Sequence, residues 1–305
     1  MTERRPPLAG EAPEPGTPRH ASPLRVSLDV TAVPRLPAGA GRYTLDLAAQ
    51  LGRREDVALS LVARADDAPR WRRLVPAAGT EALAPTPRPL RLLWEQAALP
   101  RLLDRLGVDV HHGPHYTMPE GTRLPRVVTI HDLSFFDHPE WHQRSKVALF
   151  RRAVRRAVRQ AEALVCVSAT TAAHLRELFS PAGEIHVVHH GVDHDRFRPG
   201  GDDDREDMRL LAKAGVRPPY VAFVGTIEPR KDVPTLLRAF DRMCRAHAGL
   251  TVVLAGGRGW GLEPVEAALR AARSPGRVRW LGYVSDELVP PLLRRSAAVA
   301  YPSLE

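Results

Sequence analysis

Short apolar runs alternate with helical segments along most of this chain, and this alternation limits the possible folds more than any other feature. Residues 24–30 and 126–130 are such runs, whereas residues 90–106 and 146–161 carry apolar residues at helical spacing. Strands that are apolar throughout are buried on both faces, which is typical of a parallel sheet covered by helices. The sequence therefore predicts an α/β fold.

The alternation breaks once, at a polar stretch over residues 198–219, and then resumes. A chain of 305 residues is long enough for two domains. We expect a disordered lead-in at 1–24, a first domain at 25–199, a polar linker at 200–217 and a second domain at 218–305. Ligands of such sheets bind at the carboxyl ends of the strands, so two facing edges predict a site in a cleft between the domains.

Cations exceed anions in this chain, and the formal net charge is +9. Nearly all the cations are Arg, and the only Lys residues are Lys146, Lys213 and Lys231. Genomic base composition explains such a bias, and so does attraction to a nucleotide, an anionic lipid surface or a nucleic acid. Because no motif that reads RNA or DNA is present, we do not expect nucleic acid as a partner.

Nothing in the sequence indicates export or a membrane span. No apolar stretch reaches the ~18 residues that a spanning helix needs, and the first 24 residues lack the apolar segment of a signal peptide. The two cysteines, Cys166 and Cys244, lie in different predicted domains and imply no disulfide framework. We therefore expect a cytoplasmic protein.

A glycine-rich segment, Gly39-Ala40-Gly41-Arg42-Tyr43, lies between the first predicted strand and a helix predicted over 43–51. Gly39 and Gly41 would let the backbone approach a ligand closely, and a helix N-terminus favours an anion. The spacing does not match a dinucleotide-binding loop. A tight turn with no ligand is the alternative.

His131 and Asp132 follow the buried run 126–130, at the end of a strand where a site is expected. His131 could donate a hydrogen bond to a sugar hydroxyl or take part in proton transfer. A histidine that is simply satisfied at a strand end is the alternative. His138 and His142 lie nearby, but their spacing does not match a zinc site, so we expect no metal.

The segment 223–231 is the most informative of the chain. A strand ends at Gly225-Thr226, and the adjacent cations Arg230 and Lys231 precede a helix that starts near Pro234. Cations and backbone N–H groups at a helix N-terminus all favour negative charge, so these residues predict a receptor for a diphosphate. A surface pair of cations is the alternative.

Taken in order, these segments resemble family 4 glycosyltransferases, which are retaining enzymes of the GT-B fold with two Rossmann-like domains facing each other across a cleft. The resemblance covers residues from about 25 to 305. The motifs that carry it are residues 39–43, 128–134, 167–168, 190–193, 197–199, 224–226, 228–231 and 281–284.

The resemblance implies that the first domain holds an acceptor and the second a nucleotide-diphosphate sugar. His131 would contact the donor sugar at the reacting centre, and Arg230 and Lys231 would bind the diphosphate and stabilise the leaving nucleotide. Gly41 would direct a backbone N–H to the donor phosphate. The other expected donor-site residues are Gly39, Gly225, Thr226, Gly282, Tyr283 and Val284, the last three lining the base pocket.

The same resemblance implies a metal-independent hexosyltransferase without a resident cofactor. Mannose from GDP-mannose is one expectation for the donor, and a glucosyl or rhamnosyl donor is compatible with the same residues. The acidic run 202–204 contains the Asp-x-Asp pattern of metal-dependent transferases of another fold, but no strand precedes it. We interpret that run as a solvated group of charges.

Members of the family continue beyond Pro-Ser-Leu into a Glu-Gly-Phe-Gly loop and a second Glu, which hold donor hydroxyl groups. Glu305 is either the variable residue before that loop or its first Glu. We therefore expect the second domain to be incomplete and this form of the chain to be inactive or weakly active. The alternative is a non-catalytic fragment or pseudoenzyme that binds a nucleotide or a protein partner.

The expected acceptor is a glycan or a lipid-linked molecule. The predicted helix 146–161 has five Arg on the side opposite its apolar face. A basic amphipathic helix can lie on an anionic membrane, so peripheral association with the inner membrane face is one hypothesis. An ordinary covering helix with a solvated basic face is the other.

Overall fold

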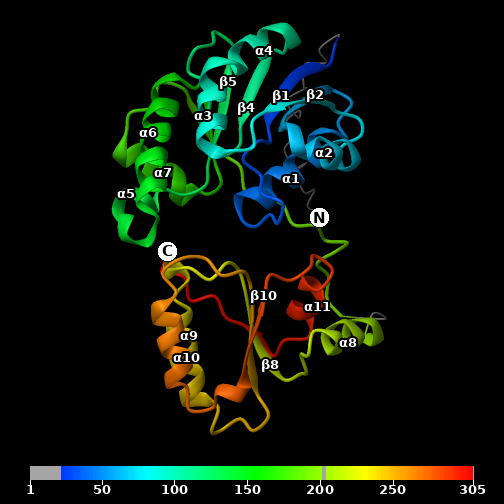
Figure 1. The fold of residues 1–305 in the computed structure, drawn as a ribbon, viewed down its shortest axis with the longest axis vertical. Helices are drawn as coiled ribbons and strands as arrows, with labels where there is room; N and C mark the ends of the chain where they lie inside the picture. Colours follow the sequence, from blue (N-terminus) through cyan, green and yellow to red (C-terminus); the bar gives the residue numbers. More distant parts are fainter. Residues whose placement is uncertain (1–21, 201–203, 305) are drawn as a thin grey trace, which may run out of the picture.

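Two parallel sheets form two units, which lie one above the other in Figure 1. The structure is a computed structural model and describes residues 22–200 and 204–304. Most of the predicted lead-in, two of the three residues of the acidic run 202–204, and Glu305 lie outside the described residues. The predictions made for them are therefore not examined by the structure.

The first unit is built on a seven-stranded sheet with the order β3-β2-β1-β4-β5-β6-β7. Neighbouring strands are parallel throughout, and Leu28 of β1 lies in register with Leu61 of β2. The strands are β1 Leu24–Asp29, β2 Val57–Arg64, β3 Gly79–Ala84, β4 Val110–Gly113, β5 Arg126–Ile130, β6 Ala163–Cys166 and β7 Glu184–Val187.

Helices cover both faces of this sheet because its strands are apolar on both sides. Apolar residues of β1 and β2 pack with α1 and α2, Val62 packs with α4, and residues of β5 and β6 pack with α5, α6 and α7. The helices are α1 Ala40–Leu51, α2 Ala68–Leu74, α3 Arg88–Ala97, α4 Leu99–Leu106, α5 Ser134–Asp137, α6 Arg144–Gln160 and α7 Ala169–Leu178, with short 3-10 turns η1 Ala65–Asp67 and η2 Pro139–Trp141.

The second unit has a four-stranded parallel sheet with the order β10-β9-β8-β11. Val252 and Leu254 of β9 pack with α9 and α10, whereas Val253 and Ala255 pack with α8 and α11, so helices lie on opposite sides of the sheet (Figure 1). The strands are β8 Tyr220–Val224, β9 Thr251–Ala255, β10 Val278–Gly282 and β11 Ala298–Val299. The helices are α8 Asp204–Lys213, α9 Val233–Met243, α10 Glu263–Ala271 and α11 Val289–Arg294, with 3-10 turns η3 Pro229–Lys231 and η4 Pro275–Arg277.

The predicted α/β fold is confirmed, but two local predictions need correction. The single helix expected over 90–106 is two helices, α3 and α4, which break at Ala98 because Pro100 cannot donate the backbone hydrogen bond that would continue the helix. The predicted linker 200–217 contains α8, whose Leu211 is fully buried in the second unit.

Within the part of the chain that the structure describes, no helix combines the length and the apolar character needed to cross a membrane. Part of the basic face of α6 is engaged within the protein. Arg151 donates to the carbonyl oxygens of Phe135 and Phe136, and Arg152 and Arg156 form ion pairs with Glu120. Arg152, Arg155 and Arg159 are nevertheless exposed.

Candidate donor and acceptor site

Glycines bring the ends of three strands of the second sheet together. A Cβ atom on Gly256, the residue after β9, would lie 1.7 Å from the carbonyl oxygen of Gly225, so only glycine fits there. The Gly256 N–H donates to the carbonyl oxygen of Gly282 at 2.7 Å, and the Gly225 N–H donates to that of Ala255 at 2.9 Å. Gly282 also has a φ of 73°, which favours glycine. The predicted residues Gly225 and Gly282 thus form one edge with Gly256, which sequence reasoning missed.

Arg230 and Lys231 lie on the turn η3, directly before α9 begins at Val233. Arg230 donates to the Glu228 carboxylate at 3.3 Å, yet its Nε is buried and has no hydrogen-bond partner among the described residues. Leaving a buried donor unsatisfied costs about 1–3 kcal/mol. An anion bound here would satisfy that donor, as expected for a diphosphate receptor.

Burial raises the pKa of the Glu228 carboxyl, and the negative charge of Asp132 in the first unit acts in the same direction. The neighbouring cations Arg230 and Lys231 oppose this rise. Glu228 therefore lies within electrostatic range of both units. Its ion pair with Arg230 fixes one side of the guanidinium group.

The last described residues pack against this cationic turn. The Leu304 N–H and the Ser303 hydroxyl both donate to the carbonyl oxygen of Arg230, at 2.9 and 3.3 Å. The Nζ of Lys231 lies 4.4 Å from the ring centroid of Tyr301. This segment follows β11, so the end of that strand supports the turn that carries both cations.

In the first unit, His131 follows β5 as predicted, and its Nε2 lies 2.8 Å from the carbonyl oxygen of Pro114. A carbonyl oxygen can only accept, so Nε2 carries the proton. Burial lowers the pKa of His131, which favours the neutral ring with a lone pair on Nδ1. We expected His131 to donate a hydrogen bond to a sugar hydroxyl. In the structure its Nε2–H already donates to Pro114, so Nε2 does not make that hydrogen bond. Nδ1 can instead accept a hydrogen bond from a hydroxyl.

Aromatic rings surround His131. Tyr43 of α1 contacts it edge-on with ring centroids 5.0 Å apart, and His190 stacks at 6.1 Å. The Tyr43 hydroxyl is 3.1 Å from the Oγ1 of Thr129, which also contacts the Nε2 of His112 at 2.8 Å. These hydrogen bonds and ring contacts fix the positions of the side chains around His131.

The other two histidines of the predicted region have separate partners. His142 contacts the Ser134 hydroxyl at 2.9 Å, and His138 stacks on Trp141 with ring centroids 3.8 Å apart. Among the described residues, no group of three or more His, Cys, Asp or Glu side chains is placed to hold a metal ion.

The glycine-rich segment differs from its prediction. Helix α1 begins at Ala40, three residues earlier than expected, so Gly41 is helical and Gly39 is the N-cap residue with a φ of 49°. The Gly41 N–H donates to the carbonyl oxygen of Ala38 at 3.0 Å. That N–H is therefore not directed at a donor phosphate. A Cβ on Gly41 would lie 3.2 Å from Pro34, so close packing explains this glycine.

Two groups of side-chain contacts join the two units. Trp260, in the loop after β9, donates from Nε1 to the carbonyl oxygen of Trp141 at 3.0 Å, and the Nζ of Lys146 lies 5.0 Å from the Trp260 ring centroid. In the second group, Asp286 forms ion pairs with Arg42 of α1 and with Arg196. These contacts bring the carboxyl ends of the two sheets into one region.

The remaining predicted residues lie at the same edge of the second sheet. Thr226 and Tyr283 directly follow Gly225 and Gly282, and Tyr283 is largely exposed. Val284 instead packs against the apolar cluster formed with α8 and α11. Trp260, Asp286 and Tyr301 were missed because their partners lie far away in the sequence. A Gly at the end of each of three consecutive strands was the signal that could have identified Gly256.

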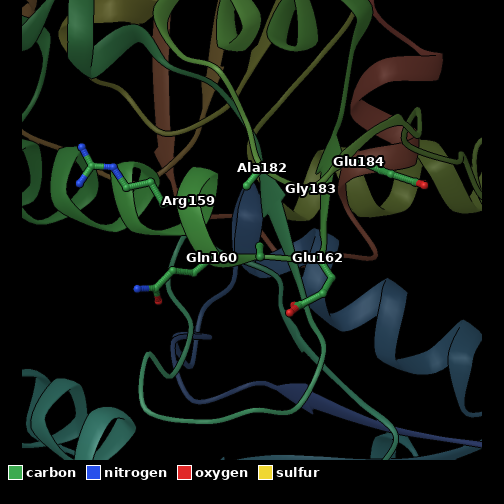
Figure 2. A pocket seen from close by; sticks show the side chains of 7 residues that line it. Arg159, Gln160, Glu162, Ala182, Gly183 and Glu184 are labelled. Carbon is green, nitrogen blue, oxygen red and sulfur yellow. The ribbon is translucent and has the colours of Figure 1, made fainter.

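A separate hollow of about 540 Å³ lies where β6 and β7 begin, at the end of the first sheet opposite to His131 (Figure 2). Its labelled side chains of Arg159, Glu162 and Glu184 are spread around the opening. The charged side chains there have mixed signs and do not converge. This hollow does not contribute to the site.

Comparisons with known proteins agree with this geometry. The model of Glycosyltransferase Family 4 matches residues 37–196, and that of Glycosyl transferases group 1 matches residues 204–305. The O-antigen chain mannosyltransferase B of Escherichia coli is 29% identical over 198 residues, which are 64% of this chain and 51% of that protein. The D-inositol 3-phosphate glycosyltransferase of Nocardia farcinica is 32% identical over 192 residues, 59% of this chain and 42% of that protein.

Solved structures share the fold. Sucrose-phosphate synthase from Thermosynechococcus elongatus has a TM-score of 0.69 at 17% identity, over 92% of this chain and 75% of that chain. Anabaena HepE in complex with UDP-glucose has a TM-score of 0.65 at 17% identity, over 92% and 74%. The matched regions cover about half or less of each curated relative named above. With two parallel α/β units, two matching models and these neighbours, the chain belongs to glycosyltransferase family 4 and has the GT-B fold.

Proposed function

We propose that the protein transfers a hexose from a nucleotide-diphosphate sugar to a glycan or lipid-linked acceptor with retention of configuration. The observation that carries the proposal is the cationic turn before α9, where the buried Nε of Arg230 has no hydrogen-bond partner among the described residues and Lys231 lies beside it. Arg230 acts electrostatically on His142 of the first unit, and Asp132 of that unit acts on the neighbouring Glu228.

In this proposal Arg230 and Lys231 bind the diphosphate and stabilise the negative charge that develops on it as the sugar leaves. Two fixed cations and the N-terminal N–H groups of α9 provide this stabilisation without a metal ion. The strand-end residues Gly225 and Thr226 allow the diphosphate to approach the backbone. Gly282 and Tyr283 provide the surface for the base.

Transfer then occurs on one face of the sugar. The bond between the anomeric carbon and the diphosphate oxygen breaks, and the acceptor hydroxyl oxygen bonds to the same face of that carbon. The acceptor proton passes to the departing diphosphate, so no carboxylate nucleophile is required. His131 accepts a hydrogen bond from a donor-sugar hydroxyl through Nδ1 and thereby orients the sugar.

Mannose from GDP-mannose is the donor we favour, because the relatives include mannosyltransferases of Escherichia coli. UDP-glucose, which is bound in the Anabaena structure, is the alternative that the test must distinguish. A lipid-linked acceptor would bring the protein to a membrane surface. The arginines of α6 that pair within the protein are not the contact we would assign to it.

The test is a thermal-shift and calorimetric comparison of GDP-, UDP-, ADP- and dTDP-sugars, each with and without a chelator. We expect one nucleotide to stabilise the protein and the chelator to have no effect. Arg230→Ala should abolish the response, while Arg238→Ala, an exposed change on α9, should retain it. Stabilisation by none of the nucleotides, or only with a divalent cation, would contradict the proposal.

A further inference from the structure

The ring of Tyr301 lies between the end of β8 and the Lys231 ammonium group. It stacks on Phe223 of β8 with ring centroids 5.7 Å apart and an interplanar angle of 12°. The Lys231 Nζ lies 4.4 Å from the centroid of Tyr301. A Cβ on Gly225 would lie 3.6 Å from the same ring, so the ring also borders the glycine edge. One aromatic residue therefore touches three parts of the donor site.

A lysine needs such support more than an arginine does. Its ammonium group sits on a flexible four-carbon stem, and fixing that stem costs up to about 2 kcal/mol of side-chain entropy. Arg230 is held by its ion pair with Glu228, whereas no hydrogen bond or ion pair between Lys231 and another side chain is recorded among the described residues. The aromatic face is thus the contact that restricts the Lys231 side chain.

We propose that Tyr301 is a positioning residue that holds Lys231 ready for the diphosphate of the donor. This inference rests on the proposed function, and it assigns a task to a side chain that the donor motifs do not include. The face of the ring attracts the ammonium group electrostatically and keeps it beside Gly225. Donor binding then does not need to order the lysine, which raises affinity through preorganisation.

The neighbouring residues extend this arrangement to Arg230. Ser303 and Leu304 both hydrogen-bond to the carbonyl oxygen of Arg230, two and three residues after Tyr301. The same short segment therefore holds the backbone of one cation and the side chain of the other. A change in that segment acts on the phosphate end of the donor and not on the base end near Gly282.

The first test observes the contact without any ligand. The chain has only three lysines, so reductive methylation with ¹³C-formaldehyde gives three lysine signals by NMR besides that of the N-terminus. Ring currents should shift Lys231, over Tyr301, and Lys146, over Trp260, away from Lys213, which lies on α8. Tyr301→Leu should move Lys231 to the position of Lys213 and leave Lys146 in place. An unchanged Lys231 signal would overturn the inference.

The second test measures affinity by calorimetry on unmodified protein, with GDP, UDP, ADP and dTDP and the matching monophosphates. Tyr301→Leu should weaken binding of the preferred diphosphate by roughly two- to fivefold, the size of an exposed cation–π contact. It should leave the monophosphate nearly unchanged. Tyr301→Phe keeps the ring and should bind like the wild type. Arg258→Met removes a comparable cation from the ring of Trp280, at 4.7 Å, and serves as the control.

The outcomes separate this inference from the function on which it rests. If the wild type binds a diphosphate and Tyr301→Leu binds it equally well or more tightly, Tyr301 does not position Lys231 and only this inference fails. If the wild type binds none of the diphosphates, the proposed function fails and the inference falls with it. A loss in Tyr301→Leu that Lys231→Met also shows, without further loss in the double variant, would support it.

Discussion

The two units present different chemistry at the carboxyl ends of their strands. In the first unit the strand ends carry buried, neutral side chains, because burial lowers the pKa of His112 to about 4 and that of His115 to about 3. Burial also raises the pKa of Glu95 on α3 to about 8. In the second unit the strand ends carry glycines and two fixed cations. The first arrangement suits hydroxyl groups, and the second suits a diphosphate.

This difference follows from how each unit leaves its sheet. At the ends of β4 and β5 polar side chains are buried, so burial keeps His112 neutral while its ring contacts the Thr129 hydroxyl. Beyond β8, β9 and β10, glycines bring backbone close to backbone, and Arg230 and Lys231 place two cations on the turn before α9. The four predictions below test whether the first unit depends on side-chain hydrogen bonds and whether the second unit depends on backbone proximity.

Removing the charge of Arg230 in the second unit should have the largest effect on sugar transfer. Arg230→Ala should lower kcat/KM for sugar transfer by about 100-fold or more, because it removes a charged donor from the leaving group. Arg230→Lys should recover part of the loss, since it keeps the charge and not the planar donors. Steady-state kinetics on the intact enzyme provides the measurement. A loss below about fivefold would remove Arg230 from the proposed mechanism.

Adding one methyl group to the glycine edge should destabilise the second unit. Gly256→Ala places a Cβ 1.7 Å from the carbonyl oxygen of Gly225, so the strand ends must separate, at about 1–3 kcal/mol or more. Gly257→Ala is the matched control, because nothing lies within 4 Å of a Cβ at that position. Urea unfolding curves compare the two variants. Equal midpoints would show that backbone proximity is not required there.

Glu95 should make the stability of the first unit depend on pH. Its folded pKa of about 8 lies above the ordinary value of 4.5, so folding takes up a proton between these values. The resulting stability is complete below about pH 4.5 and is lost as pH rises through 8, by up to about 1.4 kcal/mol per pH unit. Burial lowers the pKa values of His111, His112 and His115, so their protonation changes the stability only below about pH 6.5.

Between pH 6.5 and 8 the histidines no longer contribute, but burial also raises the pKa of the neighbouring Asp29 carboxyl. In that window both proteins should lose stability as pH rises, and the wild type should lose it more steeply than Glu95→Gln. Chemical unfolding at several pH values measures the slopes. Parallel slopes for the two proteins would mean that Glu95 is ionised in the folded state.

The smallest expected effect concerns a shared hydroxyl. Thr129→Val keeps the shape of a buried side chain and leaves Tyr43 and His112 without their common partner, which should cost about 1–2 kcal/mol. Thr80→Val is the control within the same sheet, because the Oγ1 of Thr80 is buried and has no hydrogen-bond partner among the described residues. That change should be neutral or stabilising. Equal losses in thermal unfolding would contradict the contrast between the two hydroxyl groups.

Sequence reasoning predicted the strands best where burial on both faces makes them continuously apolar. Residues 126–130 form β5 with the predicted bounds. The edge strand β3 was missed because Gly79, Glu81 and the partly exposed residues around them lack the apolar pattern. In β3 only the last residue is buried, so the strand has no periodic pattern of apolar residues that could predict it.

Among the site residues, those carried by local motifs were placed correctly in the chain, and those defined by distant partners were not found. Arg230 and Lys231 precede α9 as predicted. Asp286 contacts Arg42, which is 244 residues away, and nothing near either residue indicates this pairing. Gly41 differs from its prediction because α1 starts at Ala40 and the Gly41 N–H donates to the carbonyl oxygen of Ala38.

The ion pairs of Asp286 have a consequence for how donor binding and acceptor binding affect each other. Asp286 lies a few residues after Gly282, where the base is proposed to rest, and it holds Arg42 next to Tyr43. A molecule that displaces the loop carrying Asp286 must alter the packing around His131. A molecule that fixes α1 must in turn alter that loop. By thermodynamic reciprocity the two binding free energies change by the same amount. Titrating the donor with and without the acceptor would therefore yield one coupling constant, whichever substrate is added first.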